Sequence, residues 1–122
     1  MCIRDRSYGY KYAGGSNIED VAWYYGNSSN QTHDVGTKRA NELGLYDMAG
    51  NVLEWCQDWH GSYSSDSQTN PAGPASGDVC VYRGGSWNGS TVGCRVSFRF
   101  GHVPSYCNDV IGLRLALSGR DL

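Results

Sequence analysis

The sequence predicts a small α+β domain with little regular secondary structure, short antiparallel strands and long loops. Glycine supplies 17 of the 122 residues, roughly twice its average share, and this favours many turns over a helical bundle. Residues 94–100 and 111–117 alternate apolar with polar or small side chains, which is the pattern of half-buried strands. Nine Tyr, four Trp and two Phe provide large side chains to bury beneath the loops. A chain of this length forms one domain.

Charge and apolar content exclude two kinds of partner. Ten Lys and Arg against twelve Asp and Glu give a formal net charge of −2, so there is no broad basic field to attract nucleic acid. No apolar run approaches the roughly 20 residues that a membrane-spanning helix needs. We therefore expect neither nucleic-acid binding nor membrane insertion.

One short helix and one long loop are expected in the first part of the chain. Ser16 and Glu19 have the spacing of a capping box, which predicts a helix over residues 16–25. Residues 61–78 are rich in Ser, Gly, Pro and Asp, a composition typical of a surface loop.

Two strands are expected in the middle of the chain. One begins at Leu53, from which apolar residues alternate along the sequence, and the other covers residues 79–83. Glu54 would then lie on a strand with both faces covered, where a carboxylate needs a partner. An arginine such as Arg83 or Arg114 could be that partner.

The start of the chain and the cysteines need separate comment. Residues 1–7 show no periodicity, and Met-Cys-Ile-Arg-Asp-Arg resembles the translation of a sequencing-adapter end, so we expect this segment to be adapter-derived or disordered. The remaining cysteines show neither CxxC nor zinc-ligand spacing and allow three disulfide pairings. They are Cys56, Cys80, Cys94 and Cys107.

Several motifs occur together in the order and spacing of one known family. They are Gly-Leu-Tyr-Asp-Met-Ala-Gly-Asn-Val-Leu-Glu-Trp at 44–55, Asp58, Asn-Pro-Ala-Gly-Pro at 70–74, Arg-Gly-Gly-Ser-Trp at 83–87, Cys94-Arg95, and Ile-Gly-Leu-Arg-Leu-Ala at 111–116. In these motifs the chain resembles the formylglycine-generating-enzyme family, also called the sulfatase-modifying-factor domain. The resemblance implies an elaborated C-type-lectin-like fold, with residues 8–122 forming the C-terminal part of such a domain.

The resemblance also implies where copper would bind. Members that generate formylglycine oxidise a sulfatase cysteine with molecular oxygen and copper, which is held by two cysteines just after the Gly-Gly-Ser-aromatic motif. Gly89 stands at the first of these positions and Cys94 falls near the second. Ser86 matches an active-site serine of the family, so Ser86 and Cys94 are the catalytic candidates. A single thiolate does not make a copper site, so we do not expect copper; Cys94 is then a buried apolar residue or half of a disulfide.

Calcium is the expected cofactor. By resemblance, the family binds it through a side-chain oxygen, two backbone carbonyls and a glutamate, and calcium prefers such hard oxygen ligands. These positions correspond to Asp47, Gly50, Val52 and Glu54. A second family site, with neutral side-chain ligands here, corresponds to Asn17, Ile18, Asn27 and Ser29.

The segment 88–110 has an unusual composition. It contains no Lys, Glu, Gln, Met or Trp, although these types fill 14 of the first 87 positions. Asparagine codons randomised at their adenines yield this alphabet, and the segment resembles the variable region of proteins diversified by retroelements. The alternative is chance, because residues 111–122 lack the same five types. The candidate ligand-contacting residues are Asn88, Ser90, Phe98, Phe100, His102, Val103, Ser105, Tyr106, Asn108 and Asp109.

Together these observations favour a binding module over an enzyme. We expect a calcium-stabilised domain without the copper-binding cysteine pair, which presents the surface around residues 88–110 to a protein or cell-surface ligand. The alternative is a copper-dependent oxidase that converts a sulfatase cysteine to formylglycine.

Overall fold

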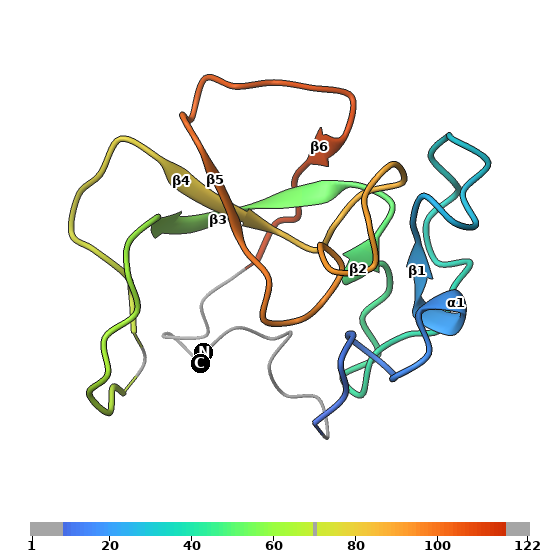
Figure 1. The fold of residues 1–122 in the computed structure, drawn as a ribbon, viewed down its shortest axis with the longest axis horizontal. Coiled ribbons are helices and arrows are strands. Elements are labelled where there is room, and N and C mark those ends of the chain that lie inside the picture. The colour runs from blue at the N-terminus through green and yellow to red at the C-terminus, as the bar shows by residue number, and fades with distance from the viewer. Residues whose placement is uncertain (1–8, 70, 117–122) are drawn as a thin grey trace.

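Two small sheets and long irregular segments make up the structure, a computed structural model that describes residues 9–69 and 71–116. A four-stranded sheet has the strand order β5-β4-β3-β6, and a two-stranded sheet pairs β1 with β2 (Figure 1). The elements are α1 (Ile18–Val21), β1 (Ala22–Trp23), β2 (Ala49–Gly50), β3 (Leu53–Trp59), β4 (Cys80–Arg83), β5 (Phe100–His102) and β6 (Ile111–Gly112). Among the described residues, no helix has the length and apolar character needed to cross a bilayer.

The antiparallel pair β3 and β4 is the centre of the larger sheet. Glu54 lies opposite Arg83, and a register irregularity follows before Trp59 pairs with Cys80. β5 adds antiparallel to β4. The predicted short antiparallel strands are thus present, and β6 adds to them a short parallel pairing with β3. The predicted strands from Leu53 and over residues 79–83 are confirmed as β3 and β4.

The predicted helix over residues 16–25 is a single turn. Asn17 caps α1 by accepting a hydrogen bond from the Glu19 amide through its side chain. Ile18 and Val21 are buried as expected of the inner face. The chain is already extended at β1, which lies parallel to β2, because this pairing replaces further helical hydrogen bonds.

The predicted strand over residues 94–100 was wrong, since only β5 at its end is extended. The Arg83 side chain donates from Nη1 to the carbonyl oxygens of Val96 and Phe98, each at 3.2 Å. The Val96 amide donates to the Lys11 carbonyl at 3.1 Å. A side chain and a distant loop thus satisfy backbone groups that would otherwise pair with a neighbouring strand.

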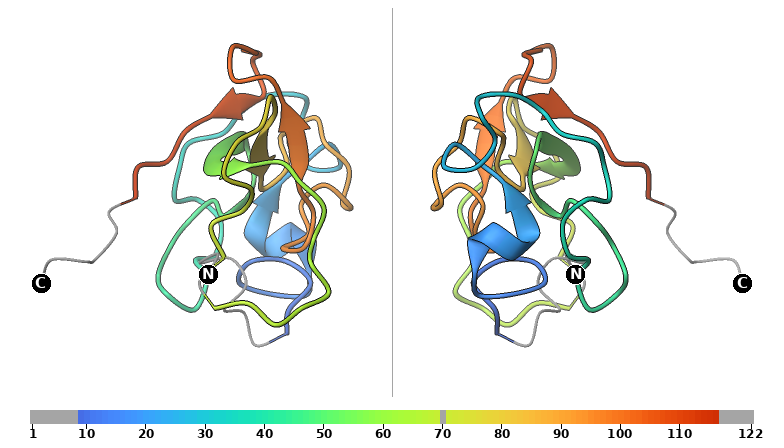
Figure 2. Two further views of the ribbon diagram at one scale, coloured as in Figure 1. Left: turned by 90° about the vertical axis from the view of Figure 1, so that its left-hand side faces the viewer. Right: turned by 90° about the vertical axis from the view of Figure 1, so that its right-hand side faces the viewer.

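The predicted strand over residues 111–117 is also shorter than expected. It pairs with β3 only at Ile111 and Gly112, and Leu117 lies outside the described residues, as do residues 1–7. Leu113 and Leu115 are 72% and 91% exposed, in a segment that runs away from the sheets (Figure 2). Their alternation therefore does not mark a buried face within the described chain.

The main core lies between the helix, the small sheet and the Gly-Gly-Ser turn. It is built mostly of small side chains that allow close backbone approach. Its buried members are Tyr12, Ile18, Val21, Ala22, Ala49 and Cys94. All four described cysteines are free thiols, so none of the three possible disulfide pairings is formed.

Candidate functional site

The segment from Asp47 to Asn51 has an unusual backbone. Asp47, Gly50 and Asn51 have φ values of 56°, 75° and 65°, in the left-handed region that Asp and Asn visit more readily than other non-glycine residues. The Gly50 amide donates to the Gly84 carbonyl at 2.6 Å, and the Asn51 amide donates to the Trp23 carbonyl at 2.7 Å. The first bond ties β2 to the turn that follows β4, and the second ties Asn51 to β1.

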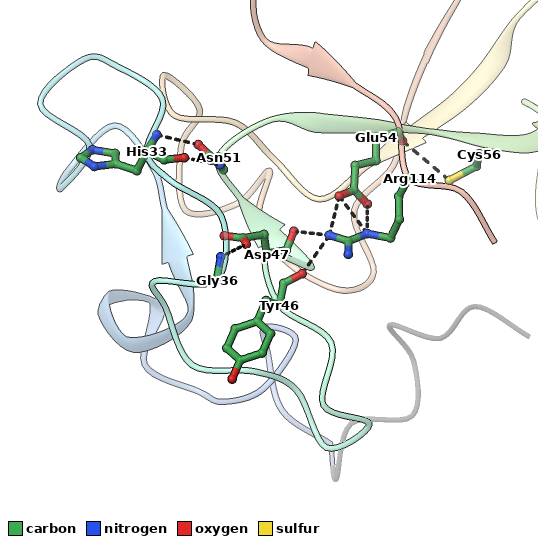
Figure 3. Close-up of polar contacts among 8 residues, drawn as sticks. All are labelled: His33, Gly36, Tyr46, Asp47, Asn51, Glu54, Cys56 and Arg114. Carbon is green, nitrogen blue, oxygen red and sulfur yellow. Dashed lines mark hydrogen bonds and ion pairs between the residues drawn. The ribbon is translucent and has the colours of Figure 1, made fainter.

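Side chains of the same segment bind the loop before it. The Asn51 side chain accepts from the His33 amide and donates to the His33 carbonyl, both at 3.0 Å (Figure 3). Asp47 Oδ2 accepts from the Gly36 amide at 2.7 Å. The loop is thus held by contacts that, among the residues the structure describes, leave the second carboxylate oxygen of Asp47 open to another partner or solvent.

Glu54 is buried and its described partner is an arginine. Arg114 donates from Nε to Oε1 and Oε2 at 3.1 and 3.2 Å, and from Nη2 to Oε1 at 2.8 Å (Figure 3). Nη2 also donates to the carbonyls of Tyr46 at 2.8 Å and Asp47 at 3.3 Å. Hydrogen bonding to Glu54 raises the pKa of Arg114. The arginine partner weighed from sequence is therefore present.

A pocket of about 510 Å³ opens at this pair. Asp47, Gly50, Val52 and Glu54 all border it, together with Arg114. The four positions proposed from sequence therefore surround one hollow. Among the residues described here, no three His, Cys, Asp or Glu side chains gather to hold a metal, so a cation at this pocket would rely on backbone oxygens as well.

The second candidate calcium set is engaged in local hydrogen bonds. Asn17 caps α1, and Asn27 Oδ1 accepts from the Tyr24 amide at 2.9 Å. Asn27 Nδ2 donates to Glu19 at 3.0 Å. Ser29 is exposed with φ 54°, and the Ile18 side chain is buried. Glu19, expected only as part of a capping box, accepts hydrogen bonds from Tyr24 and Asn27, and these lower its pKa.

The two catalytic candidates are buried. Ser86 is 4% exposed and donates to Asn88 Oδ1 at 2.8 Å. Cys94 is 1% exposed, and burial raises the pKa of its thiol to about 11. A side chain at Gly89 would place its Cβ 3.1 Å from Ser86 Oγ. Gly89, which the resemblance assigns to the first copper position, thus adjoins a buried serine.

The ten candidate ligand-contacting residues divide by exposure. Phe98, Phe100, His102 and Tyr106 are half-buried. Phe100 stacks on Tyr82 at 5.5 Å between ring centroids and meets Phe98 edge-on at 4.6 Å, so both phenylalanines support the sheet. The exposed positions are Asn88, Ser90, Val103, Ser105, Asn108 and Asp109.

Arg83 is a structural residue of this region whose contacts the sequence did not reveal. It is 9% exposed and donates from Nη2 to the Tyr63 hydroxyl at 2.9 Å, in addition to the carbonyls of Val96 and Phe98. It therefore links the strand β4 to both the 61–78 loop and the irregular segment before β5. No spacing in the sequence indicates acceptors so far apart along the chain.

Comparison with known proteins decides the family. The family model of the sulfatase-modifying factor enzyme 1-like domain matches residues 4–118. The chain belongs to this family. This match confirms the predicted formylglycine-generating-enzyme-like, C-type-lectin-like fold. PvdO from Pseudomonas aeruginosa also superposes on the structure, with a TM-score of 0.69 at 30% identity over 88% of this chain and 41% of that one.

Relatives of this sulfatase-modifying-factor domain are longer proteins. The chain is 33% identical to chaperone protein LppX of Paenibacillus barcinonensis over 76% of its own length and 36% of the relative's. It is 39% identical to the formylglycine-generating enzyme of Streptomyces coelicolor, over 70% and 29% respectively. Treponema denticola variable protein 1 superposes with a TM-score of 0.80 at 39% identity, over 85% of this chain and 39% of that one.

The donor chemistry of this family member fits calcium and does not fit a copper thiolate pair. Glu54 and Asp47 place two carboxylates, which are hard oxygen ligands of the kind calcium prefers, at the same pocket, where Arg114 pairs with Glu54. Copper bound by paired thiolates needs two soft ligands, and only Cys94 of the two positions carries sulfur.

Cys94 should resist alkylation in the folded domain. The thiolate is the reactive form, and Cys94 combines burial with a pKa of about 11, whereas Cys107 is exposed. Iodoacetamide at pH 8, read by peptide mass spectrometry, should modify Cys107 and leave Cys94 intact until urea is added. Equal native rates at the two residues would contradict the buried placement.

The same thiol gives a pH dependence with a defined sign. Its folded pKa lies above the unfolded value of about 8.5, so its contribution to the free energy of unfolding is complete below that pH. The contribution is lost as the pH rises through about 11. Urea titrations at pH 8 and pH 10.5 should show this loss, and Cys94→Ala should reduce it.

Proposed function

We propose that this chain is a calcium-stabilised ligand-binding module of the sulfatase-modifying-factor family, without the copper-binding cysteine pair and with a variable C-terminal surface. The likeness to Treponema denticola variable protein 1 carries the proposal. It is supported by the exposure of six of the ten candidate positions, whose side chains can therefore vary without changing the buried core. Loop-borne side chains on a rigid base suit the recognition of varied partners.

The proposal is tested with a library of variants of this surface. A phage-displayed library would randomise the six exposed positions, Asn88, Ser90, Val103, Ser105, Asn108 and Asp109, and would be selected on immobilised lysozyme. Most members should unfold cooperatively, and binders should emerge whose affinity is lost when the six residues are restored. A library that is mostly unfolded, or that yields no binder over repeated selections, would contradict a display role for this surface.

The calcium part of the proposal predicts a thermal shift. A ligand that binds only the folded state stabilises it by about 2.7 kcal/mol at one hundred times its Kd, and EDTA should remove this gain. Asp47→Asn and Glu54→Gln should abolish the shift, because each removes a carboxylate charge from the pocket. Asp109→Asn is the matched control, since Asp109 is exposed and does not border that pocket. An unchanged melting temperature across millimolar calcium would refute the site.

The rival function is formylglycine generation, which the similarity to the Streptomyces coelicolor enzyme brings into consideration. The absence of a thiol at Gly89 and the burial of Cys94 argue against it. Oxygen consumption with copper and a cysteine-containing sulfatase peptide should be nil. Turnover that Cys94→Ala abolishes would instead establish the oxidase.

A further inference from the structure

A second, smaller pocket is bordered by residues of β3, of β6 and of the loop before β6. Its volume is about 180 Å³, and it is lined by Trp55, Tyr106, Cys107, Asn108, Ile111 and Leu113. The loop between β5 and β6 arches beyond the sheet (Figure 1). The floor therefore comes from β3, β6 and the residues just after β6, and the rim comes from the segment of unusual composition.

Contacts around the pocket hold its aromatic walls in place. Trp55 meets Tyr82 edge-on with ring centroids 5.2 Å apart. Tyr106 stacks on His102 at 3.8 Å, and its hydroxyl accepts from Asn108 Nδ2 at 2.9 Å. Rigid aromatic side chains lose little entropy on binding a ligand, which is why they are favoured in adaptable recognition surfaces.

The chemistry of the pocket selects its occupant. None of the lining residues carries a formal charge, and its surface is mostly aromatic and aliphatic, so a charged group would lose hydration without compensation. An apolar cavity of about 150 Å³ in another protein is large enough for benzene, so 180 Å³ accommodates a single side chain of that size. At the open rim, the exposed Asn108 can hydrogen-bond to the backbone of a peptide.

We propose that this pocket anchors one apolar side chain, of leucine or phenylalanine size, from a peptide or protein ligand. The inference rests on the proposed binding function and specifies the ligand class. Trp55, Ile111 and Leu113 form a base that stays the same when the surface varies, whereas Tyr106 and Asn108 tune the rim. A central apolar anchor surrounded by polar contacts is the usual arrangement of an interface hot spot.

Cys107 at the rim allows a direct test. The full chain is equilibrated in 2-mercaptoethanol with disulfide probes made from N-acetyl-Cys-Phe-amide, N-acetyl-Cys-Ser-amide or 2-phenylethanethiol. The Cys107 thiolate attacks the probe disulfide and 2-mercaptoethanol leaves, and mass spectrometry measures each adduct at Cys107. The Cys-Phe adduct should exceed the Cys-Ser adduct by roughly tenfold, as expected for burial of an aromatic side chain.

Two variants separate pocket binding from intrinsic reactivity. Ser105→Cys with Cys107→Ser moves the thiol to an exposed residue outside the lining, and the preference should disappear. Tyr106→Ala removes a wall and should also abolish it. Equal ratios at positions 105 and 107 would overturn the pocket, and capture of phenylethanethiol without Cys-Phe would overturn its peptide specificity. Because the assay needs no natural ligand, its failure leaves the library result to decide the binding function separately.

Discussion

Gly50→Ala should destabilise the domain severely. At φ 75°, an added Cβ would lie 2.6 Å from the Trp23 nitrogen and 2.9 Å from Ala22 Cβ, and it would also strike the Trp23 carbonyl oxygen. These atoms belong to β1, which pairs with β2 at this residue, so neither backbone can move without breaking the pairing. We expect a loss above about 4 kcal/mol, the range of exceptional single substitutions, measured by urea denaturation.

Gly44→Ala is the matched control. Gly44 has the same φ of 75°, but a Cβ there meets nothing within 4 Å. Its cost should be only the intrinsic penalty of the left-handed region, about 1–2 kcal/mol. If the two variants lose the same stability, the close approach of β1 and β2 is wrong.

Arg83→Met should produce the second large loss. Methionine fills much of the same volume but leaves the carbonyls of Val96 and Phe98 without their donor. Removing a buried charged donor costs about 3 kcal/mol, and hydrogen exchange should accelerate over residues 94–100. Tyr63→Phe removes only the Arg83–hydroxyl bond and should cost less than about 1 kcal/mol, because Tyr63 is exposed. Equal losses of stability in the two variants would show that the Arg83 bonds to Val96 and Phe98 do not stabilise the domain.

The sequence predicted β3 and β4, which pair with each other across the centre of the larger sheet. The alternation that begins at Leu53 predicted β3, and the short run before the paired glycines predicted β4. The composition of residues 61–78 predicted the loop. The segments 94–100 and 111–117 were mispredicted because little of their backbone pairs with a strand. The Arg83 side chain binds carbonyls of the first segment, and β3 pairs with only two residues of the second. Alternation records which side chains are apolar, but it does not record what pairs with the backbone.

The candidate site was predicted to a similar extent. The sequence placed Asp47 and Glu54 in one motif, and the structure has both bordering one pocket. It left open which arginine approaches Glu54, and the fold brings Arg114 there from 60 residues away. Phe98 and Phe100 were grouped with exposed residues because composition alone does not distinguish the two faces of a surface segment.

Sequencing the native locus tests the central claim of a variable binding surface most directly. The account predicts a near-copy of codons 88–110 nearby, differing only where that copy carries adenine, with a reverse-transcriptase gene beside it. Codons for Cys94, Arg95 and Pro104 should be identical in both copies. A locus without such a copy, beside a sulfatase gene, would contradict the variable surface and return formylglycine generation to first place.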